Sequence, residues 1–303
     1  MRFNPKARLD TGRVGDAGRG SGGGGRGGGM SLPGGVAGGG GVIGTIIVIV
    51  FIAIQVFSDN GAQTNGPATD SDRYAECQTG ADANESSDCA RRAVEVSLRS
   101  YWSGALPEQA RTEFAPTEVV TFTDSVTTGG CGAASAATGP FYCPGDRVIY
   151  LDSTFFETVL EDQLGGTGGD FVEPYVLAHE YGHHIQNLLG TMSRVRSQQG
   201  ADSDAVRLEL QADCYAGMWT RGAATTTDES GTRIFESIDG ADIDEAVSAA
   251  KTVGDDQIQK TTSGRVDREG WTHGSSEQRV RWFKVGYDGG SLQDCDTFAA
   301  TSL

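Results

Sequence analysis

From about residue 73 onward, the pattern of hydrophobic and polar positions is mixed: some stretches have the pattern of β-strands and others that of helices. Short runs at 118–123 and 147–151 are typical of β-strands. Apolar positions at helical spacing predict one helix before these strands and several after them, over the ranges 87–102, 171–189, 204–221, 241–253 and 275–285. Strands followed by helices are typical of an α+β domain, and we expect that domain to cover residues 73–303.

An uninterrupted apolar run lies at 42–57, and no charged residue occurs between Arg26 and Asp59. As a helix the run would span about 24 Å, short of the ~30 Å hydrocarbon core, although uncharged residues upstream can extend it. A buried core segment and a cleaved signal peptide are the alternatives, but no A-x-A-like cleavage site follows the run. We expect a transmembrane signal anchor at 42–58 and a polar linker at 59–72.

The first 41 residues are rich in glycine, which loses the most backbone entropy on ordering and has no side chain to bury. We therefore expect a disordered tail over residues 1–41. Within residues 1–40, two acidic residues stand against six basic ones: Arg2, Lys6, Arg8, Arg13, Arg19 and Arg26. Because this positive charge precedes the apolar run, the tail is predicted to stay in the cytoplasm and the domain to be exported.

The chain has a net charge of −17, from 24 basic and 41 acidic residues. Since the first 40 residues are net positive, the rest is more acidic still, with 18 basic against 39 acidic residues. An acidic body repels nucleic acid phosphates, so nucleic acid is excluded as an expected partner.

All six cysteines follow the apolar run, and two pairs of them share a separation of 12 residues. The sequence contains no C-x-x-C pattern, which favours disulfides over a thiolate metal site. The simplest connectivity pairs Cys77 with Cys89, Cys131 with Cys143 and Cys214 with Cys295. Disulfides form in oxidising compartments, so the domain is expected outside the cytoplasm.

Three of the four histidines lie close together, at positions 179, 183 and 184. His179, Glu180 and His183 form the pattern H-E-x-x-H, which is rare by chance at this composition. On a helix, positions i and i+4 share one face, so His179 and His183 can bind the same zinc ion. Glu180 lies about 100° further round, where it can act as general base without binding the metal. The alternative is a pair of surface histidines on an amphipathic helix.

Zinc hydrolases use three protein ligands and leave a fourth position open. The metzincin arrangement is excluded because positions 186 and 189 are Gln and Leu. We expect Glu209, 26 residues after His183, to be the third ligand, contributed by a second helix. Asp213 lies one turn beyond Glu209 and is expected to hold a ligating histidine by its other ring nitrogen. Ordinary solvent-facing acids are the alternative.

The fourth histidine, His273, is expected to stabilise the oxyanion of a tetrahedral intermediate. A structural role at the surface is the alternative, and Arg279 and Arg281 are second candidates for the same task. Asp255 and Asp256 could contribute to a calcium site.

Several stretches closely resemble the putative neutral zinc metallopeptidase family of bacteria. They are FYCPGDRVIYLD (141–152), VLAHEYGHHIQNLLG (176–190), RLELQADCYAGMW (207–219), GDDQIQ (254–259), THGSSEQRVRWF (272–283) and CDTF (295–298). The resemblance covers roughly residues 73–300, and the Glu209 and Asp213 arrangement is also similar to that of gluzincin peptidases. It implies a membrane-anchored zincin-like fold with an H-E-x-x-H active-site helix and a second ligand-bearing helix.

We therefore expect a membrane-anchored peptidase with one zinc ion per chain, acting on proteins or peptides of the cell envelope or outside the cell. Its expected partners are a polypeptide substrate and, through the N-terminal helix, the membrane. Two alternatives remain: a non-catalytic envelope module that contains zinc, and a hydrolase of peptidoglycan cross-links. An intact Glu180 favours catalysis, because a structural zinc site needs no general base and is usually closed by Cys or His ligands.

Overall fold

The computed structural model describes residues 1–9, 12–20, 67, 69 and 72–303. The expected membrane anchor at 42–58, the second half of the expected tail and most of the linker lie outside these residues. Within the described part of the chain, no helix is both long and apolar enough to cross a membrane.

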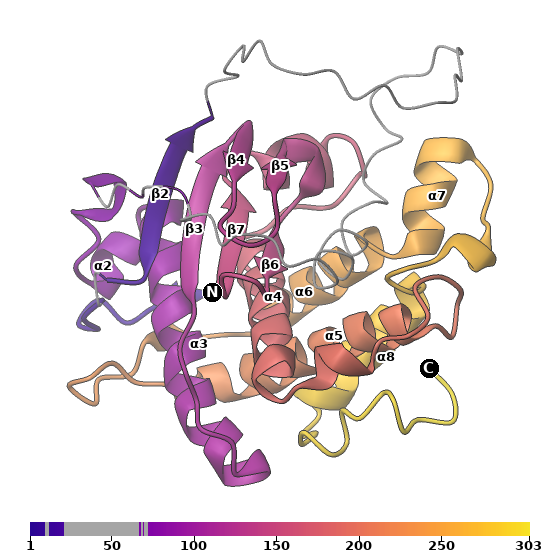
Figure 1. The fold of residues 1–303 in the computed structure, drawn as a ribbon. Helices are drawn as coiled ribbons and strands as arrows, with labels where there is room; N and C mark the ends of the chain where they lie inside the picture. Colours follow the sequence, from indigo (N-terminus) through magenta and orange to yellow (C-terminus); the bar gives the residue numbers. More distant parts are fainter. Residues whose placement is uncertain (10–11, 21–66, 68, 70–71) are drawn as a thin grey trace.

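A four-stranded sheet forms one layer of the domain (Figure 1). In spatial order its strands are β2 (Val14–Arg19), β3 (Glu118–Thr123), β7 (Val148–Asp152) and β6 (Phe141–Cys143). The first three are parallel, whereas β6 forms one edge antiparallel to β7. The middle of β3 is buried, as a central strand requires, which accounts for the apolar pair Val119 and Val120. The structure thus contains the predicted strands at 118–123 and 147–151.

Two short strand pairs accompany this sheet. β1 (Arg2–Phe3) pairs antiparallel with β8 (Phe235–Ser237). β4 (Ser125–Thr127) pairs antiparallel with β5 (Ala133–Ser135).

The N-terminal segment belongs to the domain. Val14 of β2 lies opposite Val119 of β3, and the backbone N–H of Arg8 donates to Asp228 Oδ2 at 2.7 Å. Phe3 stacks on Phe235, with 4.9 Å between the ring centroids. The prediction of a disordered tail is therefore wrong for residues 1–9 and 12–20. Backbone pairing with distant strands orders this segment despite its glycines, and composition alone does not reveal such pairing.

The same pairing bears on the predicted membrane topology. Residues 14–19 and 118–123 are neighbours in one sheet, so they lie on the same side of any membrane. A cytoplasmic N-terminus with the domain exported across a single span is incompatible with this arrangement, and that part of the prediction is wrong.

Helices form the other layer of the domain. They are α2 (Gly80–Ala83), α3 (Ser87–Ala110), α4 (Val172–Leu188), α5 (Asp204–Ala223), α6 (Gly240–Thr252), α7 (Asp255–Ser263) and α8 (Ser276–Tyr287). A π-helical turn, η5 (Phe156–Glu161), and several 3₁₀ turns connect them. All the predicted helices are present, and α3 extends eight residues beyond its predicted end at 102. The α+β prediction is confirmed.

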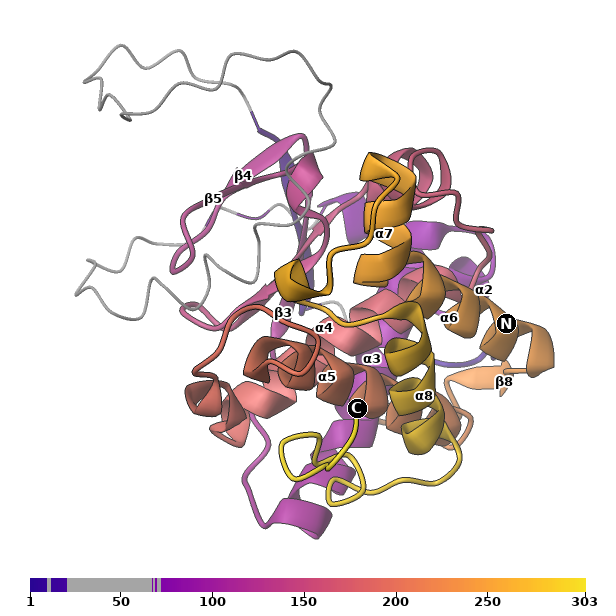
Figure 2. The same cartoon turned by 90° about the vertical axis from the view of Figure 1, so that its right-hand side faces the viewer.

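The tightest helix packing is between α5 and α8, which lie side by side in both views (Figures 1 and 2). A Cβ added at Gly286 of α8 would lie 1.9 Å from the carbonyl oxygen of Cys214. A Cβ added at Gly217 of α5 would lie 2.0 Å from the carbonyl oxygen of Phe283. The two glycines therefore let the helix backbones touch, which fixes α8 against the buried helix α5.

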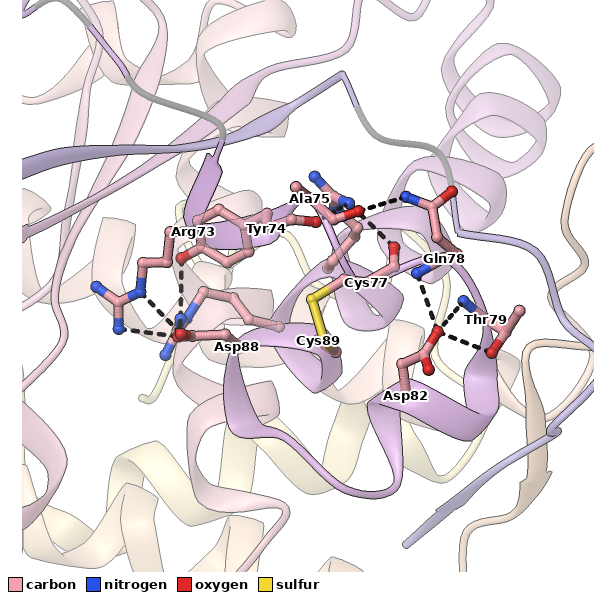
Figure 3. The surroundings of a disulfide bond; sticks show 11 residues. Arg73, Tyr74, Ala75, Cys77, Gln78, Thr79, Asp82, Asp88 and Cys89 are labelled. Atoms are coloured by element: carbon pink, nitrogen blue, oxygen red, sulfur yellow. Dashed lines mark hydrogen bonds and ion pairs between the residues drawn. A yellow bond between two sulfur atoms is a disulfide. The ribbon is translucent and has the colours of Figure 1, made fainter.

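All three predicted disulfides are present, and no cysteine is free. Cys77–Cys89 ties the segment before α2 to the first turn of α3, next to the ion pair of Arg73 and Asp88 (Figure 3). Cys131–Cys143 fixes β6, and Cys214–Cys295 fastens the C-terminal segment to α5. Three disulfides favour a location outside the cytoplasm.

Candidate metal centre

The predicted metal ligands lie on α4 and α5, which pack directly against each other (Figure 2). Where the helices meet, Gly182 of α4 faces Ala212 of α5, and a Cβ at Gly182 would lie 3.1 Å from the Ala212 backbone. A glycine within H-E-x-x-H thus allows close approach of the second helix. The approach brings the buried polar side chains of both helices together.

Two imidazoles and one carboxylate converge at this contact. His179 Nε2 lies 3.1 Å from Glu209 Oε2, and His183 Nε2 lies 3.4 Å from Glu209 Oε1. The two imidazole rings are 4.8 Å apart and nearly perpendicular. All three side chains are buried. Two nitrogen donors and one carboxylate oxygen, arranged in this way, fit the protein ligand set of a catalytic zinc site.

Asp213 lies behind His179 and connects it to α8. His179 Nδ1 is 2.9 Å from Asp213 Oδ1, to which the Tyr175 hydroxyl also donates at 2.6 Å. Arg279 donates from Nε to Oδ2 at 2.8 Å and from Nη2 to Oδ1 at 2.9 Å. Burial opposes ionisation of Asp213, but Arg279 and His179 outweigh it and lower the pKa to about 2. An ionised Asp213 orients the His179 ring, so that Nε2 faces Glu209.

Gln186 has the corresponding position behind His183. Its Oε1 lies 2.8 Å from His183 Nδ1, and its Nε2 donates to the Leu208 carbonyl at 2.7 Å and to Gln211 Oε1 at 3.1 Å. A side-chain oxygen at Nδ1 favours the tautomer in which Nδ1 carries the proton. Nε2 of His183 is then free to bind a metal.

Glu180 is buried beside these groups, and one of its oxygens lies within 4.8 Å of a nitrogen of both His179 and His183. Burial raises the pKa of Glu180, although both histidines and the backbone N–H of Tyr142 oppose the rise. A carboxylate whose pKa is raised toward neutrality is suited to accept a proton.

Edge strand β6 packs against α4 beside Glu180, and the Tyr142 N–H acts to lower the pKa of this carboxyl. The Tyr142 hydroxyl accepts a hydrogen bond from Asn187 Nδ2 at 2.8 Å and lies 3.1 Å from His184 Nδ1. Both partners are on α4. These contacts fix β6 to the helix that carries Glu180.

His273 lines the same cleft as His179, His183 and Glu209. Its Nδ1 lies 2.8 Å from Thr272 Oγ1 and 3.4 Å from Asp255 Oδ1. Burial tends to lower the pKa of His273, but Asp255 and Glu209 raise it above its ordinary value. Nε2 has no hydrogen-bond partner among the residues that the structure describes, so it can donate to a bound group.

Asp255 is used entirely within the protein. Its Oδ2 accepts the backbone N–H groups of Thr272, His273 and Gly274, at 2.8, 2.7 and 2.9 Å. Asp256 accepts the N–H of Ser276 at 2.7 Å. Hydrogen bonds within the protein therefore account for the positions of both carboxylates. They do so without the calcium ion that the sequence suggested.

The groups described above open into a cleft of about 590 Å³. The cleft is lined from α4 by His179, Glu180 and His183. It is lined from α5 by Glu209, from the 271–274 segment by His273 and from α8 by Arg279. The structure brings all six predicted site residues to this region: His179, Glu180, His183, Glu209, Asp213 and His273. Arg281, in contrast, donates to the Leu303 carbonyl and does not line the cleft.

Sequence reasoning missed the supporting roles of three residues at the site: Tyr175, Gln186 and Asp255, the last of which was expected to bind calcium. Tyr175 precedes His179 by four positions and Gln186 follows His183 by three, so helical spacing already placed them on the ligand face. Asp255 gave no such signal, because its role depends on a loop 17–19 residues away.

Comparison with known proteins agrees with this geometry. Residues 1–298 match the family described as putative neutral zinc metallopeptidase. The chain belongs to this family. The match includes β1 and β2, which supports their place in the domain.

Two relatives illustrate the extent of the similarity. The chain is 48% identical to Rv2575 of Mycobacterium tuberculosis over 231 residues, which are 76% of each protein. It is 42% identical to YpfJ of Escherichia coli K12 over 179 residues, which are 57% of this chain and 58% of YpfJ. No solved structure matches the chain. The predicted resemblance to the family is confirmed.

Proposed function

We propose that the protein is a zinc-dependent peptidase in which Glu180 is the general base. One observation supports this most strongly: a buried carboxylate with a raised pKa, Glu180, lies beside two imidazoles and a second carboxylate, on the wall of an open cleft. A site of structural zinc has no need of such a base and is usually closed by its ligands.

In this proposal His179, His183 and Glu209 hold one zinc ion, and Asp213 and Gln186 fix the two histidine rings. The bound ion supplies Lewis acidity and a water of lowered pKa. His179, His183 and Glu209 all line the cleft, so an ion held by them would be accessible to a peptide carbonyl there.

The chain's own residues move the protons and stabilise charge. Glu180 takes a proton from the attacking water and returns it to the leaving amine, so one carboxylate serves as base and then as acid. The Tyr142 N–H favours the ionised form of this carboxylate, which is the form that accepts a proton. His273 donates from Nε2 to the carbonyl oxygen as negative charge develops there, and Asp255 keeps His273 in position.

Location is the second part of the proposal. The three disulfides favour a location of the protein in the cell envelope or outside the cell. Its proposed substrates are the proteins or peptides found there. We retain the apolar segment 42–58 as the expected membrane contact. Because both flanks of this segment belong to one domain, both lie on the same side of the membrane.

The test uses the full chain, because a fragment that starts at residue 60 lacks β1 and β2. Zinc content and casein hydrolysis are measured for the wild type and for Glu180→Gln. The variant should keep its zinc and lose hydrolysis, and a chelator should abolish the wild-type activity. Loss of zinc from Glu180→Gln would show that Glu180 is a ligand, and full activity would show that it is not the base.

A further inference from the structure

The walls of the cleft are apolar beyond the metal centre. Side chains from four separate segments form them: Phe141, Phe155, Leu164, Val176, Val253 and Ile258. Phe141 belongs to the edge strand β6 and Ile258 to α7. At about 590 Å³, the cleft has room for bulky side chains next to the reacting carbonyl.

The charged groups that line the cleft all belong to the metal centre. Apart from the histidines they are Glu180, Glu209 and Arg279. Arg279 is already paired with Asp213 through two hydrogen bonds. Among the residues described, the cleft therefore offers no unpaired Lys or Arg to a substrate carboxylate.

An acidic substrate side chain would thus lose its hydration and face two carboxylates. The donor that could offset this cost is His273, which the proposed function assigns to the scissile carbonyl. An apolar side chain gains free energy from leaving water. The stem peptides of peptidoglycan carry small side chains and free carboxylates, so they match this cleft poorly.

We propose that the cleft selects polypeptide segments with a bulky apolar side chain, such as Leu, Ile, Met or Phe, beside the scissile bond. This rests on the proposed peptidase function and names its substrate class. Ile258 and Leu164 are the specificity-determining residues, since both line the cleft and neither is a proposed zinc ligand or proton-transfer group.

The experiment uses the full chain loaded with Zn²⁺ and a set of quenched fluorescent peptides. The peptides are identical except that the position on either side of the scissile bond is Ala, Leu, Phe, Lys or Glu. One methylene in an apolar pocket is worth about 10–200-fold in kcat/KM, so Leu or Phe should exceed Ala by at least about tenfold. Glu should be the poorest substrate. Purified cross-linked muropeptides should stay intact.

Variants at the cleft wall test the assigned residues. Ile258→Lys should lower kcat/KM for Leu peptides and raise it for Glu peptides, with unchanged zinc content. Leu164→Ala should shift the preference from Leu toward Phe, and it remains informative if Ile258→Lys does not fold. Val266→Lys adds the same charge at a side chain that is 52% exposed and does not line the cleft, so it should leave the profile unchanged.

The outcomes separate this inference from the proposed function. Casein left uncleaved by the zinc-loaded chain would overturn both. Casein cleavage without a preference for apolar side chains, or cleavage of the muropeptides, would overturn the substrate class alone. If Val266→Lys changes the substrate preference as much as Ile258→Lys does, the net charge of the protein sets the preference and the cleft wall does not. That result would overturn the assignment of Ile258 and Leu164.

Discussion

Asp255 holds His273 by the backbone and by the ring: its Oδ2 accepts the His273 N–H at 2.7 Å, and its Oδ1 lies 3.4 Å from Nδ1. The same Oδ2 accepts two neighbouring N–H groups, so one buried carboxylate fixes the whole turn that carries His273. Exchange of this carboxylate for an amide weakens three charge-assisted hydrogen bonds at once.

His273→Ala should lower kcat by about 10²–10³, as loss of one oxyanion donor does, and leave zinc content and KM nearly unchanged. Asp255→Asn should lower kcat by less. Asp256→Asn is the matched control, because its carboxylate contacts Ser276 and not the turn, and its kcat should equal the wild type. A wild-type kcat in His273→Ala would give the oxyanion role to Arg279, and loss of zinc would make His273 a ligand.

Zinc affinity should separate Glu209 from Asp213. Glu209→Ala removes a proposed ligand and should lose most of the bound zinc. Asp213→Asn should weaken binding by about 10–100-fold, because Asp213 orients the ligand His179 and is not itself a proposed ligand. Competition with a fluorescent chelator measures both values. Normal binding by Glu209→Ala would place the third ligand elsewhere.

Asp213→Asn should also lower stability, since Arg279 would remain buried without its counter-charge, at a cost of about 3–5 kcal/mol. Thermal unfolding of the zinc-free variant measures this loss by itself. An unchanged melting temperature would contradict a stabilising role for the ion pair of Asp213 and Arg279.

Tyr142→Phe should reduce kcat without removing zinc. The hydroxyl fixes β6 to Asn187 and His184 of α4, and its loss would let β6, which lines the cleft, shift relative to Glu180. A shift of about 1 Å in an active site can cost about 10²-fold in rate. Tyr150→Phe is the control, because it removes a hydroxyl from the neighbouring strand that donates to Asp146, outside the cleft. Equal effects of both variants on kcat would point to general damage of the sheet.

Gly286→Ala should destabilise the protein by about 1–3 kcal/mol, despite the better helix propensity of alanine. Its Cβ would lie 1.9 Å from the Cys214 carbonyl oxygen and force α5 and α8 apart. Gly104→Ala in α3 has open space around its Cβ and should stabilise by up to about 1 kcal/mol. Chemical unfolding of both variants measures the difference, and the same sign for both would contradict the close approach.

Stability should also depend on the ionisation of Asp88. Burial opposes it, but hydrogen bonds and charge from Arg73 and Arg91 outweigh burial and lower the pKa of Asp88 below 3.8 (Figure 3). The contribution of a group with a lowered folded pKa is present above its unfolded pKa and is lost as the pH falls through the folded value.

Asp88→Asn should therefore cost stability at pH 7, and the difference from wild type should shrink below about pH 4. Unfolding midpoints in urea at several pH values measure this. Glu113→Gln, an exposed change of the same charge, should show little effect at any pH. A constant difference for Asp88→Asn would contradict a role for its ionisation.

The parts of the fold that were predictable are those encoded locally. The spacing of His179 and His183, and of Glu209 and Asp213, places each pair on one helical face, and two adjacent helices then complete the centre. The strand β2 was not predictable, because VGDAGR has neither apolar alternation nor β-branched residues beyond Val14. Its partner β3 lies about a hundred residues further along the chain, and only the folded sheet shows the pairing.

The pairing of β1 with β8 also dictates an order of events during biosynthesis. Phe3 can contact Phe235 only after more than two hundred intervening residues have been made. Closing so long a loop is slow, because the chain loses conformational entropy before the stabilising contacts form. The Cys77–Cys89 bridge joins cysteines only 12 positions apart and can close much earlier. Strand β1 is thus among the last parts to dock, whereas the partner of β2 is complete by residue 123. A nascent chain that is released before residue 237 leaves β1 unpaired and open to proteases.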